Sequence, residues 1–108
     1  MNMPNILRKT IRKNKITILL YHKISPELFD KHLNFLKKRY SIISLKSVTE
    51  VLYGVSKKKL PRDSLVITFD DGWRSNYDLL PIVKKWQVPI TIFITTGLVG
   101  TYRRIWNY

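Results

Sequence analysis

The stretch "LVITFDDGW", residues 65–73, decides the fold of this 108-residue chain. Its first five residues form a continuous apolar and β-branched run, which is typical of a parallel strand covered on both faces. Two acids, Asp70 and Asp71, follow this run directly, and Gly72 comes next. Glycine allows the backbone to leave strand geometry at once. We therefore expect a buried strand with two carboxylates at its C-terminal end, the usual location of sites in parallel α/β proteins.

Three more strands and three helices are expected around this stretch. The strands are predicted at residues 15–22, 41–45 and 89–97, and the helices at 26–40, 47–55 and 77–87. Ser25 is expected to cap the first helix, and Ser47 and Glu50 to form a capping box for the second. Pro81 is expected in the first turn of the third helix, since its ring would break a later turn. Strands that alternate with helices indicate βαβ units and a parallel sheet.

The number of strands indicates how much of a larger fold the chain holds. A closed β/α barrel takes eight strands and about 250 residues. Four strands in 108 residues are about half of that. The chain is thus expected to be either a small open α/β sheet or the first half of something larger. Residues 1–15 are interpreted as a basic N-terminal helix or extension, with Leu7 and Ile11 on one face.

The composition excludes several classes of protein. The chain is 44% hydrophobic, which argues against disorder, and it has no cysteine, which excludes disulfides and thiolate metal sites. No apolar run approaches the ~20 residues that cross a bilayer. The basic N-terminus lacks a long apolar run and a small-residue cleavage site, so no secretion signal is expected and the cytoplasm is the default location.

The net charge of +13 favours anionic partners of some kind. Nucleic acid, acidic polymers and membrane surfaces all qualify. The basic clusters lie on several different elements, at residues 8–15, 37–39, 57–59 and 103–104. A nucleic-acid binder more often gathers such residues along one face, so no specific nucleic-acid partner is expected.

The two neighbouring acids raise an electrostatic question. Successive side chains of a strand point to opposite faces, so Asp70 and Asp71 cannot share one pocket while the chain stays extended. Two adjacent carboxylates also repel each other. A divalent metal resolves the conflict, because one acid serves as its ligand and the other as a general base beside a metal-bound water. The alternative is that Asp-Asp-Gly is an ordinary turn and helix cap.

One longer segment carries a family resemblance. The segment "VITFDDGWRSNYDLLPIVKKWQVPITIFITTGLVG", residues 66–100, resembles the first motif and following βα unit of the polysaccharide deacetylases, the NodB-homology carbohydrate esterases. "YHKI" at 21–24 and "SIISL" at 41–45 are also similar to the upstream part of one branch of that family. The resemblance implies that residues 16–108 form the N-terminal half of a distorted (β/α) barrel.

The same resemblance implies an activity and the roles of two residues. The activity would be metal-dependent removal of N- or O-acetyl groups from a polysaccharide, with an acetylated cell-wall or surface glycan as partner. Asp70 would be the catalytic base and Asp71 a ligand of a divalent metal, most naturally zinc. Members of the family often act at the cell surface or outside the cell.

The sequence departs from the family pattern after the first motif. The family completes its metal site with two histidines in a downstream H-[ST]-x-x-H motif, and no histidine follows His32 here. The later arginine motif, Asp-Trp motif and final acid histidine are missing too. Catalytic zinc sites normally take three protein ligands plus water. The chain is therefore expected to be a fragment, truncated before the histidine motif and inactive by itself.

Several other residues allow two interpretations. His22, at the end of the first strand, is read either as a substrate contact or support for the base, or as a strand-end histidine bonded to nearby backbone. Trp73 is read as one wall of the sugar site or as a core aromatic. Thr95 and Thr96 are candidates for lining the same mouth, although β-propensity alone explains them. His32 is expected to be a packed or boundary residue.

Two other functions compete with the deacetylase. The first is a small basic module that binds nucleic acid or another anionic polymer, with the aspartates as helix caps. The second is a non-catalytic carbohydrate-binding protein. In each case the uncovered edges of a four-stranded parallel sheet make self-association an expected property.

Overall fold

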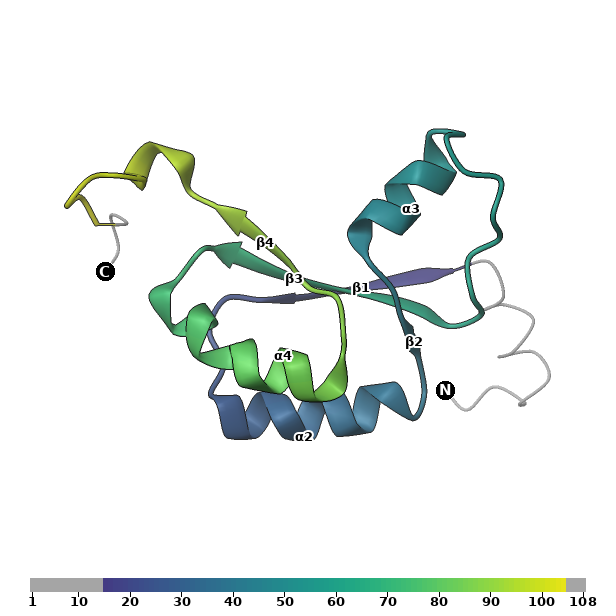
Figure 1. Cartoon of the computed structure of the whole chain (residues 1–108), viewed down its shortest axis with the longest axis horizontal. Helices are drawn as coiled ribbons and strands as arrows, with labels where there is room; N and C mark the ends of the chain where they lie inside the picture. Colours follow the sequence, from purple (N-terminus) through teal and green to yellow (C-terminus); the bar gives the residue numbers. More distant parts are fainter. Residues whose placement is uncertain (1–14, 105–108) are drawn as a thin grey trace, which may run out of the picture.

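The computed structural model describes residues 15–104, which form one sheet with helices on both of its sides (Figure 1). The helix expected within residues 1–15 and the last four residues lie outside this range. Along the chain, the elements are β1 (Ile16–Tyr21), α2 (Pro26–Lys37), β2 (Ser41–Ile42), α3 (Leu45–Leu52), β3 (Ser64–Asp71), the 3₁₀ helix η1 (Arg74–Leu79), α4 (Leu80–Trp86), β4 (Thr91–Ile94) and the 3₁₀ helix η2 (Thr96–Leu98).

Strand β3 is the centre of the sheet, and every pairing in the described chain is parallel. β1 runs along one edge of β3, from Ile16 beside Ser64 to Tyr21 beside Phe69. The other edge is shared, because β2 pairs with the start of β3 and β4 with its end. The expected four-stranded parallel sheet is thus confirmed. Its topology brings the C-terminal ends of β1, β3 and β4 together.

The core lies between the sheet and helices α2 and α4, which cover the same face (Figure 1). Phe29 and Leu33 of α2 are fully buried against Leu65, Ile67 and Phe69 of β3. Each residue from Leu65 to Phe69 is at most 3% exposed. This confirms that β3 is covered on both faces and gives its C-terminal end a rigid support.

An acid on α2 links the two covering helices. The carboxylate Oδ1 of Asp30 accepts hydrogen bonds from Lys85 Nζ at 2.8 Å and from Trp86 Nε1 at 2.7 Å, both on α4. These two hydrogen bonds, that from Lys85 first, lower the pKa of Asp30 below its ordinary value. Lys37 Nζ adds a third link by donating to the carbonyl of Trp86 at 2.9 Å.

The second helix begins earlier than the sequence suggested. Ser44 is its N-cap, and the Ser44 hydroxyl accepts from the backbone N–H of Ser47 at 3.1 Å. The predicted capping box at Ser47 and Glu50 is therefore wrong. Ser44 and Ser47 are both capping residues, and each has a residue three positions later with which a cap can form. Ser44 lies nearer the N-terminus, and the helix begins directly after it. The turn at Ser44 also limits β2 to Ser41–Ile42, against the predicted 41–45.

The third helical segment starts as a 3₁₀ helix. η1 occupies residues 74–79, and the α-helix follows from Leu80 with Pro81 in its first turn, which confirms the expected place of this proline. Among the described residues, no helix combines the length and the apolar character that a bilayer crossing requires.

Candidate active site

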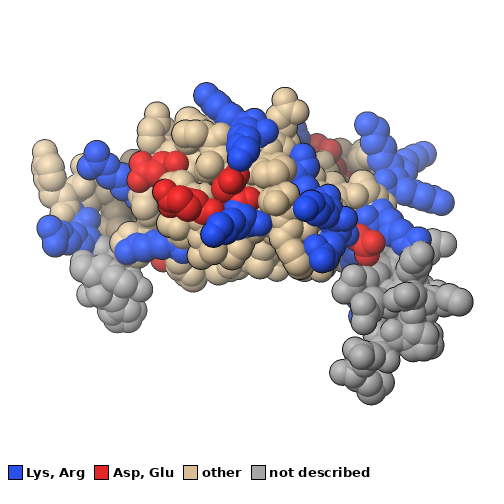
Figure 2. Space-filling view, turned by 90° about the horizontal axis from the view of Figure 1, so that it is seen from below, with Lys and Arg blue, Asp and Glu red and all other residues tan. Residues whose placement is uncertain are grey.

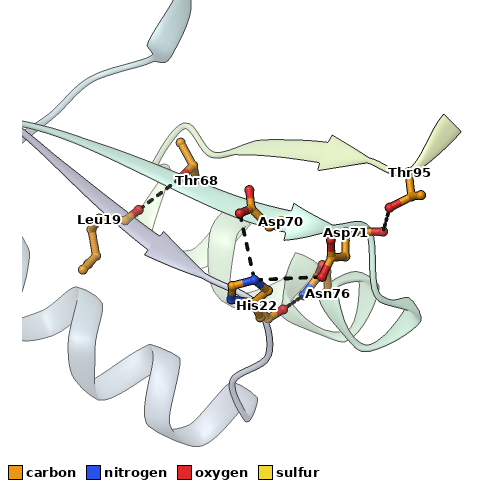
Figure 3. Close-up of polar contacts among 7 residues, drawn as sticks. All are labelled: Leu19, His22, Thr68, Asp70, Asp71, Asn76 and Thr95. Carbon is orange, nitrogen blue, oxygen red and sulfur yellow. Dashed lines mark hydrogen bonds and ion pairs between the residues drawn. The ribbon is translucent and has the colours of Figure 1, made fainter. Parts of the chain in front are cut away.

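Two acids and a histidine meet at the C-terminal end of β3 (Figure 3). The ring atom Nε2 of His22 lies 3.9 Å from Asp70 Oδ2 and 3.9 Å from Asp71 Oδ2. His22 follows β1, so the pairing of β1 with β3 brings it to the acids. The separation exceeds a direct hydrogen bond.

A left-handed residue allows both acids to face the same ring. Asp71 has φ of 74°, so the backbone leaves the extended conformation at Asp71 itself. The sequence had placed this departure one residue later, at Gly72. Aspartate tolerates the left-handed region better than most residues. The alternation of strand side chains is thereby broken, and the two carboxylates come to one side.

Two features of the structure each require glycine at position 72. Its φ is 68°, and a Cβ built on it would lie 2.5 Å from the Cγ2 of Ile94 on β4. The backbone after the acids therefore approaches β4 too closely for any side chain. This contact fixes the path of the chain as it leaves the site.

The three side chains remain accessible. The exposed fraction is 57% for the side chain of His22, 34% for Asp70 and 36% for Asp71. Their supports are buried: Thr68 precedes the pair and its hydroxyl donates to the carbonyl of Leu19 at 3.4 Å. The site thus combines a buried support with accessible polar side chains.

Asn76 is a site residue that the sequence analysis missed. It lies on η1 with only 5% of its surface exposed, and its Nδ2 donates to the carbonyl of His22 at 3.0 Å (Figure 3). The bond ties the segment after the acids to the segment after β1. The available sequence signal was an amide residue at the start of an amphipathic segment, three residues after Trp73. Its partner is 54 residues away, which no local pattern reveals.

A pocket of about 500 Å³ adjoins Asp71, between the segments that follow β3 and β4. Trp73 lines it, and Lys23 Nζ stands 3.6 Å from the centre of the Trp73 ring. Thr95 lines it too, and its hydroxyl donates to the carbonyl of Asp71 at 3.4 Å. Thr96 does not line this pocket. His32 lies away from both, where its Nδ1 is hydrogen-bonded to the hydroxyl of Tyr21 at 2.7 Å.

The described residues supply only part of a metal site. His22, Asp70 and Asp71 offer one ring nitrogen and carboxylate oxygens, which are ligand types suited to zinc. Residues 15–104 nevertheless hold no group of three or more histidine, cysteine, aspartate or glutamate side chains arranged to bind a metal ion. The donor set of this part of the chain therefore does not fit a metal by itself.

Basic side chains are spread over the surface. On the face that α2 and α4 cover, Figure 2 shows Lys and Arg side chains at many separate places, with acidic side chains gathered among them. This face carries no continuous basic stripe.

Residues 57–107 match the family model described as polysaccharide deacetylase. The Bacillus subtilis protein YxkH, which carries a polysaccharide deacetylase name, is 32% identical over 102 residues, or 85% of this chain and 36% of its own length. A Staphylococcus aureus poly-beta-1,6-N-acetyl-D-glucosamine N-deacetylase is 37% identical over 81 residues, or 73% of this chain and 27% of its own. The chain thus spans about a third of the length of these relatives.

A solved structure confirms the fold. A de-N-acetylase from Aggregatibacter actinomycetemcomitans superposes with a TM-score of 0.73 at 24% identity, covering 86% of this chain and 44% of that protein. The α/β architecture is that of part of a NodB-type barrel, as the sequence led us to expect.

Proposed function

The chain belongs to the polysaccharide deacetylase family, and from this premise we propose that it contributes to a hydrolase that removes acetyl groups from a polysaccharide. The observation that carries the proposal is the meeting of Asp70, Asp71 and His22 at the C-terminal end of β3. In the proposed organisation, residues 16–108 are part of the deacetylase domain and residues 1–15 are an extension. The N-deacetylase name of the Staphylococcus relative favours an N-acetyl group on a hexosamine polymer.

Asp70 is proposed as the general base. It stands at the end of a buried strand, so its carboxylate is held in place while a third of it stays accessible. The carboxylate takes a proton from a water molecule as the water oxygen bonds to the acetyl carbon. Positioned general bases of this kind contribute about 10²- to 10⁴-fold to a rate.

His22 is proposed as the group that completes proton transfer. Its Nε2 lies 3.9 Å from the Asp70 carboxylate, so the two groups stand side by side at the site. As the carbon–nitrogen bond breaks, the proton that Asp70 took from the water passes by way of the His22 ring to the leaving amine, and acetate is released.

Asp71 is proposed as the metal ligand that this chain contributes. The family is generally metal-dependent, and a divalent metal held in part by Asp71, with zinc as our candidate, would supply Lewis-acid chemistry at the acetyl carbonyl. Residues 15–104 do not supply a complete set of ligands. Trp73, at the wall of the neighbouring pocket, is proposed to contact the sugar, and His22 is proposed to contact it as well.

The experiment compares two matched substitutions in the protein that carries this chain. Asp70→Asn is expected to lower kcat for acetate release from an N-acetylglucosamine oligomer by about 10²- to 10⁴-fold with a small change in KM. Asp78→Asn makes the same chemical change at an exposed position of η1 and is expected to leave kcat unchanged. Full activity in the Asp70→Asn protein would exclude Asp70 as the base.

A further inference from the structure

Three arginines gather at the pocket beside the proposed site. Arg74 follows Trp73 after β3, and Arg103 and Arg104 follow η2 after β4; all three line the 500 Å³ pocket. We call this the arginine pocket. Its remaining walls are mainly apolar, from Ile94, Leu98 and Val99 with the ring of Trp73.

The three guanidinium groups have no acidic partner in the described chain. Among residues 15–104, none of them forms an ion pair or a side-chain hydrogen bond. Asp71 is the one acid among the residues that line the pocket. Three like charges around one small space repel each other, and a bound anion would relieve that repulsion.

We propose that the arginine pocket binds a carboxylate or phosphate group carried by the polymer, so that the substrate is an anionic polysaccharide. This inference rests on the proposed deacetylase function and names its substrate class. The planar guanidinium group suits both anions, because its N–H donors match the oxygens of a carboxylate or a phosphate two at a time. The apolar walls and the ring of Trp73 offer a surface against which a sugar ring can pack.

The size and place of the pocket fit one sugar unit next to the reacting one. A volume of about 500 Å³ lies within the range of ~300–1,000 Å³ that small-molecule sites occupy. Asp71 belongs both to the site and to the pocket wall, so a chain of sugars passes from one to the other without a gap. The charge of Asp71 repels an anion, so the anionic group is placed on the arginine side and the acetyl group on the aspartate side.

The net charge of +13 attracts any polyanion, so the experiment must separate the pocket from the total charge. The probes are a hyaluronan hexasaccharide, which alternates glucuronate with N-acetylglucosamine, and neutral chitohexaose. Each probe is titrated by calorimetry into the Asp70→Asn chain, because this substitution prevents turnover during the measurement. We expect the hyaluronan probe to bind about tenfold more tightly than chitohexaose at low salt, with a difference that shrinks as salt is added.

Matched double variants identify the residues responsible. Arg103→Gln with Arg104→Gln is expected to abolish the tenfold preference. Lys58→Gln with Lys59→Gln removes the same total charge from an exposed loop and is expected to keep it. Circular dichroism of both variants checks that they fold alike.

Two results would overturn the proposal. One is an equal loss of affinity in both double variants, which would mean attraction by overall charge. The other is competition by a short DNA duplex as effective as that by hyaluronan. Glucuronate and N-acetylglucosamine 6-phosphate, titrated separately, distinguish a carboxylate from a phosphate. The titration measures binding and the Asp70→Asn experiment measures turnover. A negative result in either one therefore does not decide the other.

Discussion

Asp71 shows why the sequence predicts where the site lies but not how its side chains are oriented. The paired acids, the apolar strand before them and the glycine after them placed Asp70 and Asp71 at the end of a parallel strand, and the structure has them there. The sequence did not reveal that Asp71 itself adopts a φ of 74°, since Gly72 is the residue for which that region is ordinary. The shared direction of the two carboxylates follows from that one dihedral angle.

Asn76 is expected to hold His22 near the acids. Asn76→Ala removes the donor to the carbonyl of His22, and loss of a hydrogen bond costs about 0.5–1.5 kcal/mol of unfolding free energy. The variant should also let the ring of His22 move away from Asp70. In the parent chain, Asp70→Asn should change the NMR chemical shifts of the His22 ring protons. In the Asn76→Ala chain, the same substitution should no longer change them.

Asn34→Ala is the matched control for this prediction, because Asn34 is an exposed amide on α2. It should leave both the unfolding free energy and the His22 ring signals close to those of the parent. If Asn76→Ala behaves in the same way, Asn76 has no role in positioning His22.

Gly72 is expected to be intolerant of any side chain. Gly72→Ala combines a left-handed backbone, which costs about 1–2 kcal/mol for an L-residue, with a contact of 2.5 Å to Ile94 Cγ2. Gly54 has φ of 73°, but a Cβ added there would meet nothing within 4 Å, so Gly54→Ala should cost only the backbone part. Urea unfolding of both variants gives the comparison. Equal losses would show that Ile94 moves aside without cost.

At the scale of elements, Asp30 makes the packing of α2 against α4 sensitive to acid. Its pKa is lowered in the folded protein, first by the hydrogen bond from Lys85 and then by that from Trp86. An acid with a lowered pKa contributes stability that is fully present above its unfolded value of 3.8 and is lost as the pH falls through the folded value. Asp30→Asn should therefore reduce the loss of stability below about pH 4.

Urea midpoints measured between about pH 2 and 6 test this expectation. Asp78→Asn, an exposed acid without an ion pair among the described residues, should retain the acid dependence of the parent chain. A parent-like acid dependence in the Asp30→Asn chain would contradict the proposed helix link.

The elements themselves were predictable where one local signal dominated. Continuous apolar character identified β3, and Ser25 with Pro26 gave the start of α2 correctly. The errors arose where two signals overlapped, as with Ser44 and Ser47, both of which suit a cap. η1 was missed because a 3₁₀ segment before Pro81 carries the same apolar spacing as the first turn of an α-helix.

At the scale of the whole molecule, the strands β1 and β4 expose apolar side chains on either side of the buried strand β3. Ile18, Leu20 and Phe93 lie beside Val66, Thr68 and Asp70 in the register, and each of the three is more than half exposed. Exposed apolar patches promote association. We therefore expect the isolated chain to form dimers or larger species in sedimentation experiments.

Leu20→Lys should shift the chain toward monomer, because it introduces charge into this patch. Leu52→Lys, at an exposed leucine of α3 outside the patch, should leave the association unchanged. A parent chain that remains monomeric at high concentration would refute this expectation.

The shared edge of β3 has a consequence for motion. β2 and β4 occupy successive parts of that edge, so releasing β4 frees the end that bears the acids while β1, β2 and the buried core still hold the rest of the strand. Amide hydrogens near the acids would then exchange through local openings, and those deeper in the strand only through global unfolding. The end of β3 that bears the acids can therefore move locally while the buried part of the strand stays fixed.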